Sequence, residues 1–195
     1  MSRTGLHAYI VNKRTYVRIK VLILYAFYGT ITQANNLCFI IKFKSIGGIA
    51  MTRAIDLAKY VVNKCTVDSK PVSNLQLQKI LYFIQLNFLR LLENYAFSDD
   101  IYAWRHGPVI PQVYDAFCVY GATKICRVYN IDNNIFTGDF EHEIVDKVIE
   151  MCRDKEPWKL VEQTHRVDGP WYKVYDGDPQ TIIPKNSLKE YSKRN

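Results

Sequence analysis

Histidine and cysteine are the residue types of this chain that could support covalent or acid–base chemistry. A cysteine thiolate beside an imidazole forms the nucleophile–base pair of many hydrolases, and His165 is the candidate base, so a small hydrolase using His165 is one hypothesis for the function. However, the sequence places no cysteine beside His165 and spaces no carboxylate to orient it. We therefore expect no catalytic residue and no enzyme activity. The cysteines are Cys38, Cys65, Cys118, Cys126 and Cys152.

Metal and cofactor sites are not predicted either. A zinc site needs three or four ligands, and His106, His142 and His165 show no ligand spacing. The cysteines form no CxxC pair and no closely spaced framework, which is typical of small core residues in a reducing compartment. No glycine-rich phosphate loop occurs in the chain. We expect no metal, no cofactor and a cytoplasmic location.

The stretch from Ser73 to Pro111 is the part around which the rest of the chain is organised. Ser73 and Gln76 stand in the S-x-x-Q arrangement of a capping box, which predicts that a helix begins there. Apolar residues then recur at three- and four-residue spacing, which predicts a buried central helix over residues 73–92. These residues are Leu77, Ile80, Leu81, Ile84, Phe88, Leu91 and Leu92.

At these residues the chain resembles the Panacea-domain family, the SocA-like or GepA-like, phage-associated proteins. Three blocks in the same order carry the resemblance, which covers roughly residues 53–191. The first block is matched by Asn74, Leu75, Leu77, Gln78, Lys79, Leu81, Tyr82 and Phe83. The second is matched by Ala103, Trp104, Gly107, Pro108, Val109, Pro111, Val113 and Tyr114. The third is matched by Thr164, His165, Pro170 and Trp171.

The resemblance implies an antitoxin of a toxin–antitoxin pair that neutralises a cognate toxin, the product of the adjacent gene, by direct protein contact. In SocA-like members it also implies an adaptor that hands the toxin to a Clp-type protease. A few anchor residues dominate most protein interfaces, and we predict ten for this one. They are Gln78, Lys79, Tyr82, Gln85, Trp104, Arg105, His106, Tyr114, His165 and Trp171.

The first four predicted anchors share one edge of the central helix. Gln78, Lys79, Tyr82 and Gln85 lie at i, i+1, i+4 and i+7, where they would present donors and a phenol to a partner. The alternative is that Lys79 extends past the apolar stripe to water, as most such lysines do. His165 likewise has an alternative role, a hydrogen bond within the fold beside Trp171.

The net positive charge of the chain comes entirely from its first fifty residues. The net charge is +7, and residues 1–50 contain seven basic and no acidic side chains. Residues 51–195 hold 19 basic and 19 acidic side chains and are neutral. We therefore expect no nucleic-acid partner for residues 51–195, although a DNA-binding autoregulator remains an alternative because two helices joined near residue 70 could mimic a helix-turn-helix. No apolar run is long enough for a membrane span, so we expect no membrane partner.

The first fifty residues and the rest of the chain form the two expected parts. Gly47 and Gly48 precede Met51, and two glycine codons can spell a ribosome-binding sequence. One hypothesis is that Met51 is the native start and residues 1–50 are translated upstream sequence. A disordered or accessory extension and a short β-rich element are the alternatives. Residues 51–195 would then form the antitoxin domain.

We predict a mainly α, compact domain of five to six helices around helix 73–92, with at most one small β element. The strand is expected within 101–106, before a rigid Gly107-Pro108 turn, and an irregular extended pair is expected over 122–137. In the helix over 157–165 we expect Trp158 and Val161 to be buried. The other helices are expected over 52–65, 111–121, 139–153 and 184–192.

Overall fold

The computed structural model describes residues 52–132, 135–136 and 138–194. The predictions for the first fifty residues lie outside this part of the chain. The domain is mainly α, as expected, with seven α-helices and one two-stranded sheet in the described residues. The helices are α3 (Ala54–Val67), α4 (Asn74–Leu92), α5 (Pro111–Phe117), α6 (Asp139–Arg153), α7 (Pro157–Thr164), α8 (Pro170–Val174) and α9 (Lys185–Arg194).

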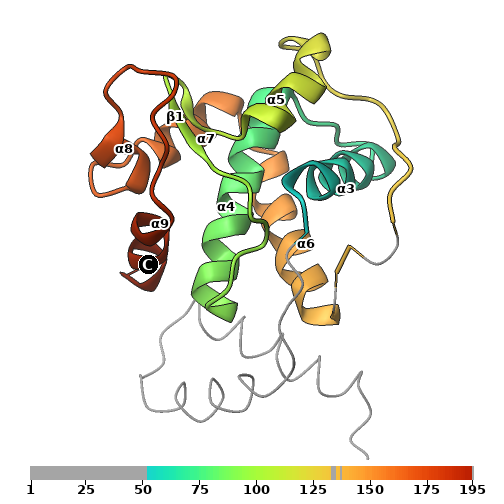
Figure 1. Cartoon of the computed structure of the whole chain (residues 1–195). Helices are drawn as coiled ribbons and strands as arrows, with labels where there is room; N and C mark the ends of the chain where they lie inside the picture. The colour runs from blue at the N-terminus through green and yellow to red at the C-terminus, as the bar shows by residue number, and fades with distance from the viewer. Residues whose placement is uncertain (1–51, 133–134, 137, 195) are drawn as a thin grey trace, which may run out of the picture. The chain divides into compact units, whose positions relative to one another are not determined.

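Helix α4 is the centre of the domain. It begins at the predicted capping box, in which the Ser73 hydroxyl accepts a hydrogen bond from the Gln76 backbone N–H and the Gln76 side chain accepts one from the Ser73 backbone N–H. Helices α3 and α6 lie on one side of α4 and α9 on the other (Figure 1). Of the predicted apolar stripe, Leu77, Ile80, Leu81, Ile84 and Phe88 are buried, whereas Leu91 and Leu92 are half-buried. Most side chains of α4 are therefore turned toward the rest of the domain, unlike those of a helix that reads a DNA groove.

The predicted strand is the first half of a hairpin. Strand β1 (Tyr102–Trp104) pairs antiparallel with β2 (Gly107–Val109), with Trp104 opposite Gly107. We expected Gly107 and Pro108 to end the strand as a rigid turn, but they begin the second strand. Gly107 has φ +97°, a left-handed conformation that glycine tolerates and other residues rarely adopt. The tip of the hairpin therefore consists of Arg105 and His106.

Three further features differ from the prediction. Pro170 begins the five-residue helix α8 where we expected only a turn, because proline suits the first helical position. In its described residues, the segment after η2 (Cys118–Tyr120) is extended and forms no paired strands. It makes an isolated β-bridge between Lys124 and Ser73. Trp158 was predicted to be buried, but 58% of its surface is exposed, whereas Val161 is buried as expected.

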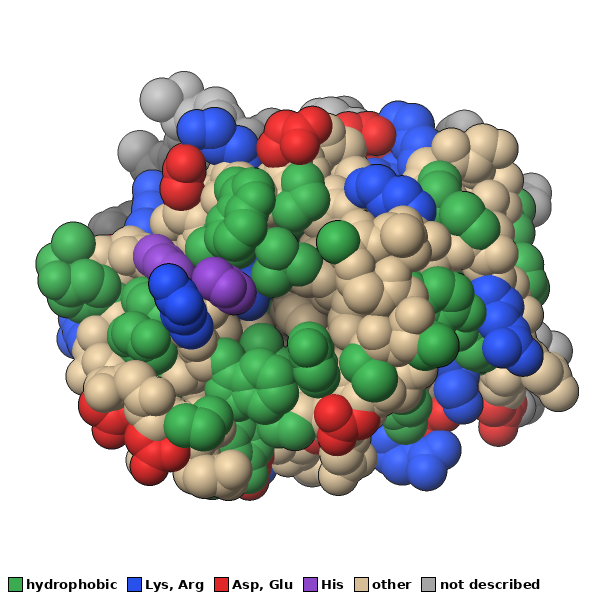
Figure 2. Space-filling view, turned by 90° about the horizontal axis from the view of Figure 1, so that it is seen from above, with side chains coloured by type: hydrophobic (Ala, Val, Ile, Leu, Met, Phe, Trp, Pro, Cys, Tyr) green, Lys and Arg blue, Asp and Glu red, His purple; other side chains and the backbone are tan. Residues whose placement is uncertain are grey.

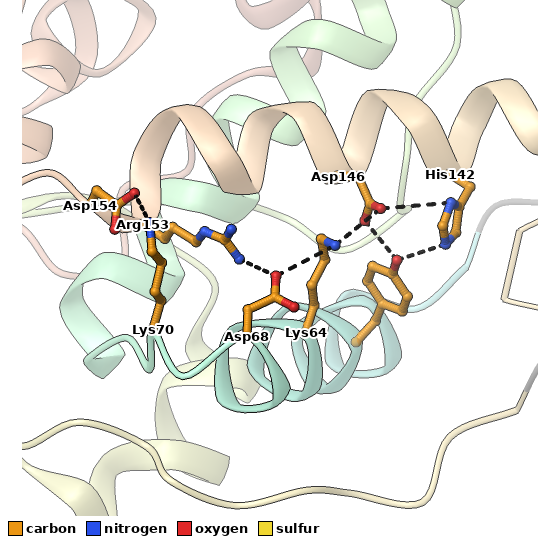
Figure 3. A network of polar contacts seen from close by, with 8 residues as sticks. Lys64, Asp68, Lys70, His142, Asp146, Arg153 and Asp154 are labelled. Carbon is orange, nitrogen blue, oxygen red and sulfur yellow. Dashed lines mark hydrogen bonds and ion pairs between the residues drawn. The ribbon is translucent and has the colours of Figure 1, made fainter.

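A polar network joins α3 to α6 (Figure 3). The Tyr60 hydroxyl donates to an Asp146 carboxylate oxygen at 2.7 Å, and Lys64 lies 3.3 Å from the same carboxylate. Arg153 pairs with Asp68, and the guanidinium keeps the pKa of that carboxyl below its usual value. None of the helices in the described part combines the length and apolar character that a bilayer span requires.

Candidate partner-binding site

The four anchors predicted on α4 are buried inside the domain. Gln78, Lys79, Tyr82 and Gln85 are each at most 2% exposed. Their backbone spacing is the predicted one, but they face the rest of the fold and not an open edge. Their part in partner binding stays a prediction, while the contacts that they make here are all internal.

Gln78 and Lys79 hold the strand that follows the hairpin tip. The Lys79 ammonium donates to the Pro108 carbonyl at 2.9 Å, and the Ile110 backbone N–H donates to the Gln78 side-chain oxygen at 2.9 Å. Neighbouring residues of one helix thus bond to two positions of the same extended segment. The hairpin is fixed to α4 by side chains that satisfy its buried backbone groups.

Gln85 makes the same kind of contact about two turns beyond Gln78 along α4. Its amide nitrogen donates to the Phe97 carbonyl at 3.1 Å. Its amide oxygen accepts from the Ala96 and Phe97 backbone N–H groups at 2.9 and 3.3 Å. A single side chain therefore satisfies three backbone groups of a loop. We call Gln78, Lys79 and Gln85 the α4 clamp.

Lys79 is the unusual member of the clamp because its side chain is fully buried. Burial disfavours the charged amine and lowers the pKa of Lys79 to about 7. The backbone of Gly107 lies directly against it. A Cβ atom on Gly107 would come 3.0 Å from the Lys79 nitrogen and 2.5 Å from the Thr164 hydroxyl oxygen. Glycine is thus required here for space as well as for conformation.

Above the clamp, the hairpin tip carries exposed residues. Arg105 and His106 are exposed, and the His106 ring packs edge-on against Trp158 of α7, with centroids 5.2 Å apart. Sequence reasoning missed Trp158 as a surface residue. The signal was ambiguous, because a position three residues before buried Val161 fits the apolar stripe but lies in the first turn of a short helix.

A stack of three rings lies beside the hairpin. His165 stacks on Trp171, with ring centroids 3.6 Å apart and an angle of 1° between the ring planes. Tyr175 also stacks on Trp171, with centroids 4.5 Å apart. The Nε2 atom of His165 is shielded from solvent and has no hydrogen-bond partner in the described structure. Burial, and to a lesser extent Lys79 and His106, lower the pKa of His165, which favours the neutral imidazole.

Indole hydrogen bonds connect the stack to the hairpin. The Trp171 N–H donates to the Trp104 carbonyl, and the Trp104 N–H donates to the Pro179 carbonyl, each at 2.9 Å. The Trp104 ring packs edge-on against Tyr114 of α5 at 5.0 Å. The structure therefore brings the six remaining predicted anchors into one region, to which Trp158 is added. We call Trp104, Arg105, His106, Tyr114, Trp158 and His165 the hairpin face.

The hairpin face is seen in a space-filling view. His106 and His165 are close enough to influence each other electrostatically, and Figure 2 shows two histidine side chains beside each other, next to a hollow with apolar side chains around it. A hollow bordered by apolar side chains is typical of surfaces that take up side chains of a partner.

None of the four cysteines in the described residues is hydrogen-bonded to His165. Burial raises the pKa of the Cys65 and Cys152 thiols to about 11, the opposite of activation. Cys118 and Cys126 are exposed. Within the described residues His165 has neither a cysteine nor a carboxylate as hydrogen-bond partner, and no group of three His, Cys, Asp or Glu side chains is arranged to hold a metal ion.

The fold and the face define a helical domain that is built around one central helix and has an aromatic, basic surface at a hairpin. Residues 77–172 match the model of the family described as antitoxin SocA-like, Panacea domain. The curated Antitoxin SocA of Caulobacter vibrioides (strain NA1000 / CB15N) is 32% identical over 135 residues, which cover 62% of this chain and 69% of that protein. No solved structure matches the chain significantly.

The chain belongs to the SocA-like antitoxin family with a Panacea domain. The family predicted from three short blocks of residues is thereby confirmed. Membership in an antitoxin family favours a regulator over an enzyme, and it brings with it a toxin as the general kind of partner.

Proposed function

We propose that this chain neutralises a cognate toxin by direct protein contact and that the hairpin face is the surface that makes the contact. The exposed Trp158 carries the proposal. The indole is 58% exposed and packs against His106, the residue after Arg105. It therefore leaves more apolar surface in contact with water than most surface side chains do. Tryptophan and arginine are also the residues most often found as interface anchors.

The rigidity of the face supports the same function. Trp104 and Trp171 are fixed by indole hydrogen bonds to backbone carbonyls, and the α4 clamp holds the hairpin from below through Pro108 and Ile110. A surface that is ordered before binding loses little conformational entropy on binding. The buried anchors predicted on α4 then serve the interface indirectly, by positioning it.

The proposal needs no catalytic step by this chain. Neutralisation by contact is either occlusion of the toxin's working surface or delivery of the captured toxin to a Clp-type protease, the adaptor role that the family resemblance implies. In both cases capture comes first and uses the same face. A cytoplasmic site of action is part of this proposal.

Co-expression with the product of the adjacent gene tests the capture step. We expect that product to arrest growth when expressed alone, to be harmless when co-expressed with this chain, and to purify with it as a complex. Trp158→Ala should weaken the complex and restore growth arrest. Tyr172→Ala is a matched control, because Tyr172 is 51% exposed and lies outside the hairpin face. Growth arrest that persists with the wild-type chain would refute the proposal.

Measuring the half-life of the toxin tests the delivery step. Delivery predicts that co-expression shortens the half-life of the toxin and that removal of the Clp-type protease restores it. Occlusion predicts the same half-life with and without that protease. Because capture precedes both outcomes, the experiment distinguishes the two routes without testing capture again.

A further inference from the structure

We infer that the hairpin face accepts an acidic segment of the toxin, whose carboxylates meet Arg105 and Arg166 while an apolar side chain covers Trp158. This inference rests on the proposed function, because it names the chemistry of the partner at the same face. Arg166 directly follows His165 in the chain, and Arg105 directly precedes His106, so each arginine is the sequence neighbour of one of the two histidines.

The two arginines differ from the charged groups on the α3–α6 side of the domain. On the α3–α6 side, carboxylates and cations are paired: Asp68 with Arg153, Asp146 with Lys64, and Asp154 with Lys70 (Figure 3). Arg105 and Arg166 are exposed, and neither makes an ion pair or a side-chain hydrogen bond within the described structure.

The acidic residues near the face do not neutralise these arginines. Glu162 of α7 is paired with Lys159 at 3.0 Å. Asp168 lies two residues after Arg166 but forms no ion pair with it or with Arg105 in the described part of the chain. The face thus presents two uncompensated guanidinium groups, which are suited to bidentate hydrogen bonding with carboxylates.

Two exposed apolar side chains are neighbours of these residues. Trp158 is 58% exposed and Val167 is 72% exposed. Val167 follows Arg166 directly in the chain, and the Trp158 ring packs against His106, which follows Arg105. A partner segment that combines carboxylates with an apolar side chain would cover both kinds of group at once.

Other occupants fit the face less well. Nucleic-acid binding depends on neutralising many phosphates with a basic patch, whereas residues 51–195 are neutral and the face offers two unpaired arginines. In a symmetric pair of copies the same patch meets itself, which would bring the guanidinium groups of both copies together without carboxylates. An acidic protein segment meets neither difficulty.

The test is the affinity of the purified toxin for the full chain, measured at about 50 and 300 mM salt. We expect the double variant Arg105→Glu, Arg166→Glu to raise the Kd about 100-fold at the lower salt concentration and to lose most of the salt dependence. Arg194→Glu is the matched control, because it makes the same change on an exposed residue of α9; its Kd should stay within about twofold of wild type.

A second pair of variants protects the test against misfolding. Arg105→Ala and Arg166→Ala remove charge without adding repulsion, and each should raise the Kd by about threefold to tenfold with an unchanged thermal unfolding midpoint. Crosslinking identifies an acidic residue of the toxin that contacts the face. Substituting lysine for that residue should restore binding to the double Glu variant.

The possible results separate this inference from the proposed function. If the wild-type chain does not bind the toxin, the proposed function fails. If the wild-type chain binds and the double Glu variant binds equally well with the same salt dependence, the acidic-segment inference fails alone. It fails also if the double variant abolishes self-association of the chain, or binding of a single-stranded DNA oligonucleotide, while the toxin still binds.

Discussion

The α4 clamp and the hairpin face both contain polar residues, and both include some residues of the blocks that match the family, but they differ in how their polar groups are satisfied. In the clamp, the side chains of Gln78 and Gln85 are bonded to the backbone and excluded from water. On the face, Arg105 is exposed and the Nε2 atom of His165 has no partner in the described residues. The comparison teaches that a family signature contains both buried residues that position a surface and residues that lie on that surface.

Gly107→Ala should show the largest effect, because Gly107 joins the two regions. The alanine would adopt φ +97° and its Cβ would overlap Thr164 and approach Lys79. We expect the free energy of unfolding, measured by urea titration, to fall by about 3 to 5 kcal/mol. Gly177→Ala is the control, since Gly177 has φ +92° with no atom near a Cβ; its loss should be about 1 to 2 kcal/mol. Equal losses in both variants would contradict the close packing described here.

Gln85→Leu removes the clamp from the loop before the hairpin. It would leave the Phe97 carbonyl and the Ala96 and Phe97 N–H groups without their partner. We expect a loss of about 2 to 4 kcal/mol in the free energy of unfolding. Gln112→Leu, at an exposed position of α5, should change it by less than about 0.5 kcal/mol. Comparable effects at both sites would mean that Gln85 behaves as a surface residue.

Lys79→Met should change how stability depends on pH. The pKa of Lys79 is about 7 in the folded chain and about 10.4 in an unfolded one. Between these values the unfolded state binds more protons, so stability rises with pH in the wild type, by about 1.4 kcal/mol per unit. We expect Lys79→Met to remove about 2 kcal/mol of this rise between pH 7 and 8.5.

The pH window for that measurement is set by the thiols. Cys65 and Cys152 have pKa values raised to about 11, so their unfolded forms lose protons first above about pH 8.5 and stability falls there. Urea titrations at pH 7.0, 7.8 and 8.5 avoid this opposing effect. If the wild type and Lys79→Met show the same slope, Lys79 is not buried as a neutral amine.

Trp158→Ala should have the smallest effect on stability and a large one on binding. Because the indole is 58% exposed, we expect the free energy of unfolding to change by less than about 1 kcal/mol, while affinity for the toxin falls about 30-fold or more. Trp171→Ala reverses the pattern, since Trp171 is buried and hydrogen-bonded. Calorimetric unfolding and titration of the same samples compare the two. If Trp158→Ala bound as well as wild type, the face would lose its principal anchor.

The sequence predicted features that depend on neighbouring residues. It did not predict the burial of side chains that depends on segments distant in the chain. The capping box of Ser73 and Gln76 and the apolar stripe of α4 depend on neighbours within a few residues, and both are present. The burial of Lys79 depends on the Pro108 carbonyl, 29 residues away. No spacing within a helix indicates which loop will lie opposite, so an inward lysine could not be told from one that reaches water.

The sequence indicated which residues belong to the candidate site but not which of them are exposed and which are buried. The residues of the hairpin and of the third block lie in one region, because the Trp171 N–H bonds to the Trp104 carbonyl, and their part in partner binding stays a prediction. Their separation into exposed and buried members required the fold: Trp171 is 5% and Trp158 58% exposed, although both lie in the first turn of a short helix that begins with proline. Helix α8 itself had a signal, since Pro170 suits the first helical position.

The different surroundings of the tryptophans give the chain a built-in optical reporter. The chain has three tryptophans, and the indoles of Trp104 and Trp171 are already engaged with backbone carbonyls. Trp158 alone is more than half exposed among them. Covering it would move its fluorescence emission to shorter wavelength, so engagement of the hairpin face could be followed without a label, and a Trp158→Phe chain would stay silent in the same titration.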